Sequence, residues 1–245
     1  MVSIPSAGVA PGGHPSFSLT WEVVAASIDH TLLKPETSEA QVRALCEQAA
    51  ERKFASVCVN PCNIRYAVEI LRGTATTVGT VVGFPLGASL TSVKCFEGGQ
   101  AAKMGARELD MVMNIGALKS SNRGLVQNDI RAVTHIAHQS GCLIKIILET
   151  GLLTLEEKIV ACELSLAAGA DYVKTCSGFA PGAATVDDIA LMRGVVGHRA
   201  GVKASGGIKT AKQLISLLEA GATRIGTSSA LAIMEEMNSS SSGSK

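Results

Sequence analysis

Two lysines lie within apolar, strand-like segments of this 245-residue sequence. Lys174 occurs in Asp-Tyr-Val-Lys-Thr-Cys-Ser-Gly (171–178), and Lys203 occurs in Gly-Val-Lys-Ala-Ser-Gly-Gly (201–207). If both side chains point into one interior, repulsion lowers the pKa of one amine, because two charges about 4 Å apart repel by about 4 kcal/mol at an effective dielectric near 20, or roughly 3 pKa units. A neutral amine is the nucleophile that Schiff-base formation with a carbonyl compound requires. The alternative is that both lysines reach outward to ordinary salt-bridge partners.

Further charged residues occur where side chains are expected to face the same interior. Asp110 lies in the apolar segment Glu-Leu-Asp-Met-Val-Met-Asn (108–114) and can serve as a proton shuttle, as the ion-pair partner of an interior lysine, or as both. Lys145 and Glu149 form a same-face charge pair in another apolar segment, mainly as part of an interior network. Asp29 is expected to anchor that network.

Glycine- and serine-containing turns indicate a second binding element. Ser205-Gly206-Gly207 and Gly226-Thr227-Ser228-Ser229 follow two late strand-like segments, and the second leads into a helix expected to begin near residue 230. Exposed backbone N–H groups, serine hydroxyls and a helix N-terminus suit a phosphate monoester. Ser177-Gly178 adds a further candidate contact. Cys58 either faces the same pocket or is a buried structural thiol.

Eight strand-like segments, each followed by a helix-like segment, must position these residues. Several strands are apolar on both faces, which is typical of parallel strands covered on both sides. Capping-box spacings at 38–41 and 154–157 mark helix starts. Eight such units in about 210 residues predict a (β/α)8 TIM barrel with its site at the C-terminal ends of the strands. An open doubly wound sheet is the competing fold, but it needs fewer units, and no G-x-G-x-x-G follows the first strand. The expected strands are 27–33, 55–60, 77–84, 108–114, 143–149, 172–177, 201–206 and 224–227.

The remaining sequence predicts one barrel domain with short ends. We assign 20–238 to the barrel, 1–19 to a flexible extension and 239–245 to a disordered Ser-rich tail. The start lacks the features of a signal peptide, and no eighteen apolar residues run together, so no membrane partner is expected.

Charge and cysteine usage exclude other classes of function. A net charge of +1 without a basic run gives no reason to expect a nucleic-acid partner. The seven cysteines have neither the spacing of a disulfide framework nor that of a zinc site, so we expect reduced thiols in a cytoplasmic protein and no metal.

Seven motifs together resemble those of the deoxyribose-phosphate aldolase family, over residues 27 to 237. They are Asp-His-Thr-Leu-Leu (29–33), Val-Cys-Val-Asn-Pro (57–61), Val-Val-Gly-Phe-Pro-Leu-Gly (81–87), Glu-Leu-Asp-Met-Val (108–112), Lys-Ile-Ile-Leu-Glu-Thr (145–150), Val-Lys-Thr-Cys-Ser-Gly-Phe (173–179) and Val-Lys-Ala-Ser-Gly-Gly-Ile (202–208).

The resemblance implies reversible cleavage of 2-deoxy-D-ribose 5-phosphate to D-glyceraldehyde 3-phosphate and acetaldehyde, with no metal and no cofactor. Lys174 would be the Schiff-base nucleophile, Lys203 the cation that keeps it reactive, and Asp110 the group that moves protons through an ordered water. Asp29 would hold Lys203, and Cys58 would lie near the substrate. The phosphate and substrate contacts would include Gly178, Gly206, Gly207, Ser228 and Ser229.

Two positions depart from the family pattern, and two other functions compete with it. Phe179 stands where some members carry a lysine, which removes one phosphate contact, and Cys176 stands where Ser or Thr is common. A transaldolase-like or keto-acid aldolase would keep Lys174 but place its acid and phosphate groups differently. A phosphate-binding barrel without chemistry has no need for two interior lysines. Dimers are common among similar proteins, so a homodimer is an expected assembly.

Overall fold

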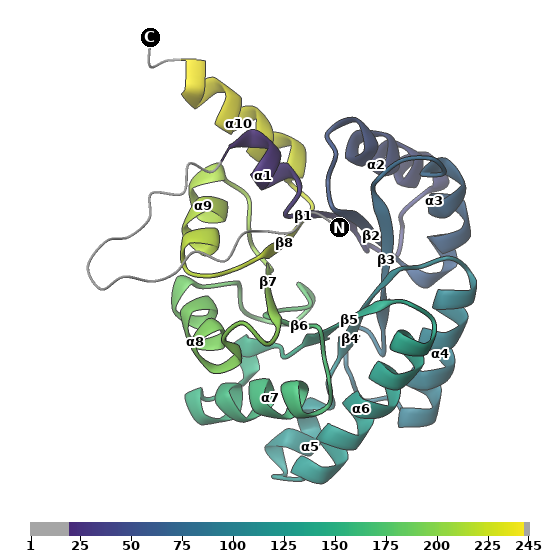
Figure 1. Ribbon diagram of the computed structural model, residues 1–245, viewed down its shortest axis with the longest axis vertical. Helices are drawn as coiled ribbons and strands as arrows, with labels where there is room; N and C mark the ends of the chain where they lie inside the picture. Colours follow the sequence, from purple (N-terminus) through teal and green to yellow (C-terminus); the bar gives the residue numbers. More distant parts are fainter. Residues whose placement is uncertain (1–19, 243–245) are drawn as a thin grey trace.

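The computed structural model describes residues 20–242, and its strands form a closed barrel (Figure 1). The eight strands are parallel and follow one another around the barrel in sequence order, so the expected (β/α)8 fold is confirmed and the open sheet is excluded. Each expected strand is present. They are β1 (Ile28–Leu32), β2 (Ser56–Val59), β3 (Thr77–Val82), β4 (Glu108–Val112), β5 (Leu143–Ile147), β6 (Tyr172–Lys174), β7 (Gly201–Ser205) and β8 (Arg224–Thr227).

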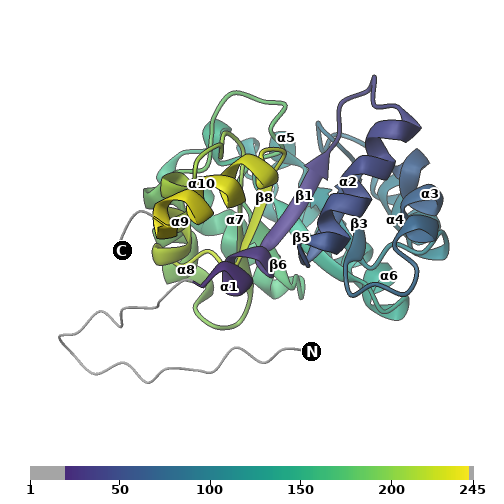
Figure 2. The same cartoon turned by 90° about the horizontal axis from the view of Figure 1, so that it is seen from above.

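Helices surround the barrel on the outside (Figures 1 and 2). Both expected capping boxes are present: the Ser38 and Thr154 side chains accept from the backbone N–H groups of Gln41 and Glu157, whose side chains bond back. The helical elements are α1 (Trp21–Ala25), α2 (Glu39–Glu51), η1 (Pro61–Asn63), α3 (Ile64–Ile70), α4 (Thr91–Lys103), α5 (Ile115–Lys119), α6 (Arg123–Gln139), η2 (Thr150–Leu152), α7 (Leu155–Ala167), α8 (Val186–Val196), α9 (Ala211–Glu219) and α10 (Ala230–Ser242).

The apolar core lies between the outer faces of the strands and the helices. Val173, Val202, Met111 and Met113 are fully buried members of this core. Because side chains alternate along a strand, their neighbours project to the other face, into the barrel. Burial of a side chain of this size stabilises the fold by about 1.5–3 kcal/mol. The outward packing of valine therefore turns its neighbouring lysine inward.

Most strands are shorter than expected from the sequence, and the last helix is longer. β6 ends at Lys174 rather than at residue 177, and β5 ends at Ile147, because the chain turns away at Glu149, whose φ is +59°. α10 continues to Ser242, so residues 239–242 belong to a helix and not to the expected tail. Serine lowers helix stability only modestly, and the first glycine after the helix start is residue 243. The expectations for 1–19 and 243–245 lie outside the described residues.

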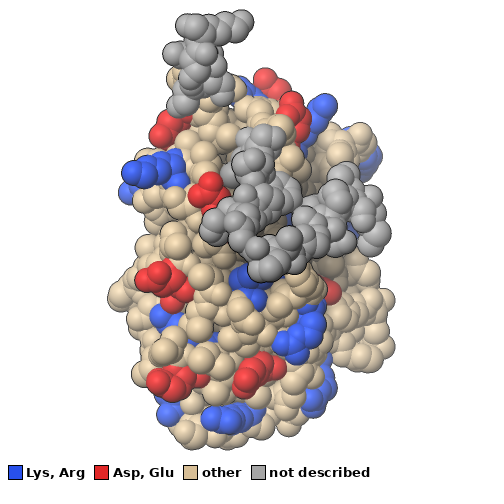
Figure 3. All heavy atoms as spheres, turned by 60° about the vertical axis from the view of Figure 1, so that its left-hand side comes forward, with Lys and Arg blue, Asp and Glu red and all other residues tan. Residues whose placement is uncertain are grey.

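The described surface and helices bear on possible partners. Figure 3 shows acidic and basic side chains interspersed on one face of the molecule. From residue 20 to residue 242, no helix combines the length and apolar character that a membrane crossing needs.

Candidate active site

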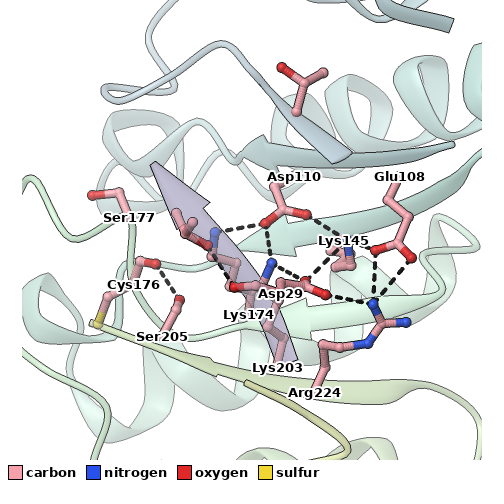
Figure 4. Close-up of polar contacts among 12 residues, drawn as sticks. Asp29, Glu108, Asp110, Lys145, Lys174, Cys176, Ser177, Lys203, Ser205 and Arg224 are labelled. Carbon is pink, nitrogen blue, oxygen red and sulfur yellow. Dashed lines mark hydrogen bonds and ion pairs between the residues drawn. The ribbon is translucent and has the colours of Figure 1, made fainter. Parts of the chain in front are cut away.

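Lys174 and Lys203 meet inside the barrel, as their spacing predicts. They are register partners on the neighbouring strands β6 and β7, and their side chains are 3% and 1% exposed. Both Nζ atoms lie 2.7 Å from the same oxygen, Oδ2 of Asp110 on β4 (Figure 4). The structure thus joins the three residues through one shared carboxylate oxygen.

Asp110 connects this pair to a wider buried network. Its other oxygen, Oδ1, accepts a hydrogen bond of 2.8 Å from Lys145 on β5. Lys203 also contacts Asp29 on β1, as expected, and Lys145 lies 2.6 Å from Glu108. Figure 4 shows these side chains converging from different strands.

Arg224 completes the network, and neither its role nor that of Glu108 was predicted from the sequence. The Nη1 atom of Arg224 lies 2.6 Å from Asp29 Oδ1 and 3.1 Å from both carboxylate oxygens of Glu108. A signal was available, because Glu108 lies two residues before Asp110 and therefore shares its inward face.

The expected pairing of Lys145 with Glu149 was wrong. Lys145 contacts Asp29, Glu108 and Asp110 instead. Glu149 lies beyond the end of β5, where its carboxylate accepts from the backbone N–H of Ser177. The alternation that would have put both side chains on one face stops where the strand stops.

The network divides its cations into two kinds. Burial lowers the pKa of Lys174, and the nearby charge of Lys203 lowers it further, although Asp110 opposes both. Burial also acts on Lys203, but the carboxylates of Asp110 and Asp29 outweigh it and raise its pKa above the usual value. The expected asymmetry between the two amines is therefore present. Burial is the largest cause of the lowered pKa of Lys174 and the charge of Lys203 is a smaller one, whereas Lys203 differs in having a second carboxylate, Asp29, that raises its pKa.

Lys145 and Asp110 are held in their charged forms. Three carboxylates oppose burial and raise the pKa of Lys145 well above its usual value. Burial acts to raise the pKa of Asp110, but Lys145, Lys174 and Lys203 outweigh it and hold that pKa well below the usual range. Lys174 is thus the lysine of the network that is disposed to lose its proton.

A glycine makes room for Lys203. Gly226 lies on β8, next to β7, and a Cβ atom at this position would lie 2.9 Å from Cε of Lys203 and 3.1 Å from Cβ of Ser205. The absence of a side chain at 226 therefore lets Lys203 cross the interior to reach Asp110 and Asp29.

A cavity of about 220 Å³ opens at the C-terminal ends of the strands, and Lys174 is among the residues that line it. Gly206 and Gly207 border it with φ values of +98° and +73°, a conformation that favours glycine and exposes backbone N–H groups. Five of the seven residues expected to bind substrate or phosphate line this cavity, as do two lysines that the sequence did not point to. These residues are Gly178, Gly206, Gly207, Ser228, Ser229, Lys34 and Lys209.

Phe179 also lines the cavity, with its ring in edge-to-face contact with Phe84 at 5.1 Å between centroids. Cys58 and Asp29 are buried and are absent from the described lining of the cavity. Burial is the main cause that raises the pKa of Cys58 to about 11, so this side chain is a thiol at neutral pH.

A second, larger cavity of about 790 Å³ lies at the opposite end of the barrel. It is bordered by Leu143, Tyr172 and Gly201, which are the first residues of β5, β6 and β7. None of the expected site residues lines it. Of these two cavities, the smaller one is therefore the one that Lys174 lines.

The sequence is similar to one protein family and to curated proteins that share one name. The model of the DeoC/LacD family of aldolases matches residues 23–236. The deoxyribose-phosphate aldolase of Streptococcus sanguinis is 56% identical over 208 residues, which are 85% of this chain and 94% of that protein. The enzyme of the same name from Lysinibacillus sphaericus is 56% identical over 210 residues, 86% of this chain and 94% of that protein.

Solved structures of proteins described by the same name are similar to this chain in fold. A putative deoxyribose-phosphate aldolase from Coccidioides immitis has a TM-score of 0.87 at 40% identity, covering 89% of this chain and 87% of that one. A tetrameric deoxyribose phosphate aldolase from Aeropyrum pernix has a TM-score of 0.84 at 30% identity, covering 90% and 93%.

Proposed function

Because the chain belongs to the DeoC/LacD family of aldolases, we propose that it reversibly cleaves 2-deoxy-D-ribose 5-phosphate to D-glyceraldehyde 3-phosphate and acetaldehyde. The observation that carries this proposal is the position of Lys174. Its amine borders the cavity, its pKa is lowered, and its Nζ lies 2.7 Å from Asp110. A buried amine that is uncharged and accessible to a carbonyl compound is a Schiff-base nucleophile.

The first step is attack of the neutral Lys174 amine on the C1 aldehyde of the open-chain sugar phosphate. A carbinolamine forms and loses water, leaving a positively charged iminium. Oδ2 of Asp110 lies beside the amine and provides the counter-charge as this charge develops. Lys203, on the same oxygen, and Asp110 are placed to move the protons that the step requires, through a water molecule at the reacting atoms.

Carbon–carbon bond cleavage follows from the electron demand of the iminium. The C3 hydroxyl loses its proton, the C2–C3 bond breaks, and its electron pair moves toward the iminium to give an enamine and free D-glyceraldehyde 3-phosphate. Protonation of the enamine carbon and hydrolysis then release acetaldehyde and regenerate Lys174. The iminium supplies the charge stabilisation that a metal ion gives in a metal-dependent aldolase, so the reaction needs no metal.

The other end of the cavity suits the phosphate of the substrate. Gly206, Gly207, Ser228 and Ser229 border it, and α10 begins directly after Ser229, so a helix N-terminus adds its partial positive charge. The Lys34 and Lys209 side chains supply positive charge at the same cavity. Phe179 lies where some relatives carry a lysine, and these two lysines are placed to compensate for that loss.

The assembly and compartment are further parts of the proposal. We infer a homodimer: the relative from Aeropyrum pernix is tetrameric, and Leu86, Leu90 and Phe96 are each about 70% exposed here and offer an apolar contact surface. Light scattering after gel filtration tests this state. All seven cysteines are free, which supports a reducing, cytoplasmic location.

Reductive trapping tests the proposed function. The full chain is treated with acetaldehyde and sodium borohydride, digested, and mapped by mass spectrometry. An ethyl group is expected on Lys174, with loss of aldolase activity in proportion to labelling. Lys94 is a matched control, because it is equally buried but lines neither cavity. Absence of the ethyl group from Lys174, or cleavage of the sugar phosphate by Lys174→Ala, refutes the proposal.

A further inference from the structure

Arg224 and Glu108 lie at the far side of the buried network from the substrate cavity. A single atom of Arg224, Nη1, contacts Asp29 at 2.6 Å and both oxygens of Glu108 at 3.1 Å. Glu108 Oε2 also lies 2.6 Å from Lys145. Neither Arg224 nor Glu108 borders the cavity that contains the Lys174 amine, so neither is placed to touch the substrate.

The number of charges in the network depends on this pair. Three carboxylates oppose four cations, so the network carries a net charge of +1 if all seven groups are ionised. It becomes neutral when one amine gives up its proton. An uncompensated charge in a buried site is strongly unfavourable, so the count itself favours one neutral amine. The seven groups are Asp29, Glu108, Asp110, Lys145, Lys174, Lys203 and Arg224.

We propose that Arg224 and Glu108 are positioning residues for the Schiff-base amine, because each contributes one charge, of opposite sign, to the balance that leaves Lys174 uncharged. This inference rests on the proposed role of Lys174 as the nucleophile. Without Arg224, three carboxylates face three lysines, and the network is neutral only when Lys174 is protonated. Without Glu108, two carboxylates face four cations, and the loss of a proton from Lys174 is favoured more strongly.

Packing fixes Arg224 in this arrangement. Its guanidinium carbon lies 5.7 Å from the centre of the Tyr172 ring, and its side chain is 12% exposed. Ser56 donates its hydroxyl to the same oxygen of Asp29 that Arg224 contacts, Oδ1, at 2.7 Å. Thr77 donates to Glu108 at 3.3 Å. The charge of Arg224 is thereby directed at the two carboxylates.

The ionisable groups around both ends of the network come from several strands. Lys174 is faced by Asp110 on β4, Lys203 on β7 and the Cys58 thiol on β2. Arg224 is faced by Asp29 on β1, Glu108 on β4 and Tyr172 on β6, with Lys145 on β5 between the two carboxylates. Of these, Arg224 and Glu108 can be exchanged for neutral groups without removing a direct contact of Lys174.

The pH dependence of kcat/KM tests the inference, because its acidic limb follows the deprotonation of the nucleophile in the free enzyme. Arg224→Gln should move this limb upward by about one pH unit, the effect of one charge about 10 Å away at an effective dielectric near 20. Glu108→Gln should move it downward by a similar amount. The double variant, which removes one charge of each sign, should return the limb to within a few tenths of a unit of the parent value.

Arg224→Lys is the conservative control, since it keeps the charge and should keep the position of the limb. A purely structural role would lower the rate of both single variants without moving their limbs in opposite directions, and that result overturns the inference. If Arg224→Gln does not fold by circular dichroism, Glu108→Gln decides: a limb that stays in place or rises refutes the inference. Borohydride trapping of Lys174 in the parent protein separates the two hypotheses, because its failure removes the proposed function itself.

Discussion

Two regions of the molecule bury lysine–aspartate contacts of similar length but differ in how the carboxylate is shared. Lys94 on α4 lies 2.6 Å from Asp129 on α6, with side chains 0% and 2% exposed. Asp129 receives one lysine, and its second oxygen accepts from the Thr91 hydroxyl at 2.8 Å. Lys94 also donates to the carbonyl of Val112. Each charge in this pair therefore has a partner of its own.

Asp110 is shared by three lysines, two of them on one oxygen. On the proposed function, burial next to an aspartate is not by itself what makes a lysine a nucleophile. One cation per carboxylate gives a neutral, structural pair. An excess of cations around a shared carboxylate leaves one amine that the network stabilises better without its proton.

The largest expected effect comes from removing the amine at the shared site. Lys174→Met should reduce kcat/KM by at least about 10³-fold, because the covalent route is lost. Its free energy of unfolding should change by less than about 1 kcal/mol, since Asp110 keeps two cations and the new side chain is apolar. Steady-state kinetics and urea unfolding check both parts. A large loss of stability would mean that Lys174 is a structural cation like Lys94.

The corresponding change at Lys94, which pairs with Asp129 alone, should have the opposite result: a loss of stability with little change in activity. Lys94→Met leaves Asp129 buried without its cation and should destabilise the protein by about 3–5 kcal/mol. Activity per folded molecule should stay close to the parent value. The control is Lys94→Met with Asp129→Leu, which should recover most of the lost stability. If the double variant is as unstable as the single one, the pair is more than a local charge contact.

Lys203→Leu sharpens the comparison by lowering the number of cations at the shared site. The charge of Lys203 lowers the pKa of Lys174, so its removal should raise that pKa. Because the neutral amine is the active form, the acidic limb of kcat/KM should move to higher pH, and the rate near neutral pH should fall by about 10²-fold. A limb that moves to lower pH would contradict this account of the shared carboxylate.

The smallest effect is expected where the cavity binds phosphate, away from the amine. Ser228→Ala removes one hydroxyl and should raise KM for 2-deoxy-D-ribose 5-phosphate by about 3–10-fold, the equivalent of about 1 kcal/mol. Kinetics with unphosphorylated 2-deoxy-D-ribose should be unchanged, and so should the acidic limb. An equal loss with both sugars would show that Ser228 does not contact the phosphate.

Alternation along short strands made the barrel and the central part of the site predictable from sequence. Val173 and Val202 must pack against helices, so Lys174 and Lys203 must point inward, and parallel strands that follow each other in the chain bring them together. The turns after the last two strands were predictable for the same reason, because they lie at the same end of the barrel.

The wider network could not be derived in this way. Lys145 and Glu149 share a face only if the strand continues to residue 149. The periodicity of apolar residues does not predict the turn of the backbone at Glu149. Arg224 opens its strand, where a charged residue is ordinarily assumed to meet solvent. Only the tilt and closure of the barrel bring it against Asp29 and Glu108 from distant parts of the sequence.

The absence of a side chain at Gly226 limits which substitutions this position tolerates, both in engineered variants and in natural sequences. Its missing side chain leaves the space through which Lys203 passes. Gly226 also lines the proposed substrate cavity, and replacement by alanine would place a methyl group against Cε of Lys203, displacing the ammonium group that the proposed mechanism uses. Saturation libraries that aim at new aldehyde acceptors should therefore keep codon 226 fixed, because loss of activity at this position would reflect a displaced lysine as well as any change in acceptor fit.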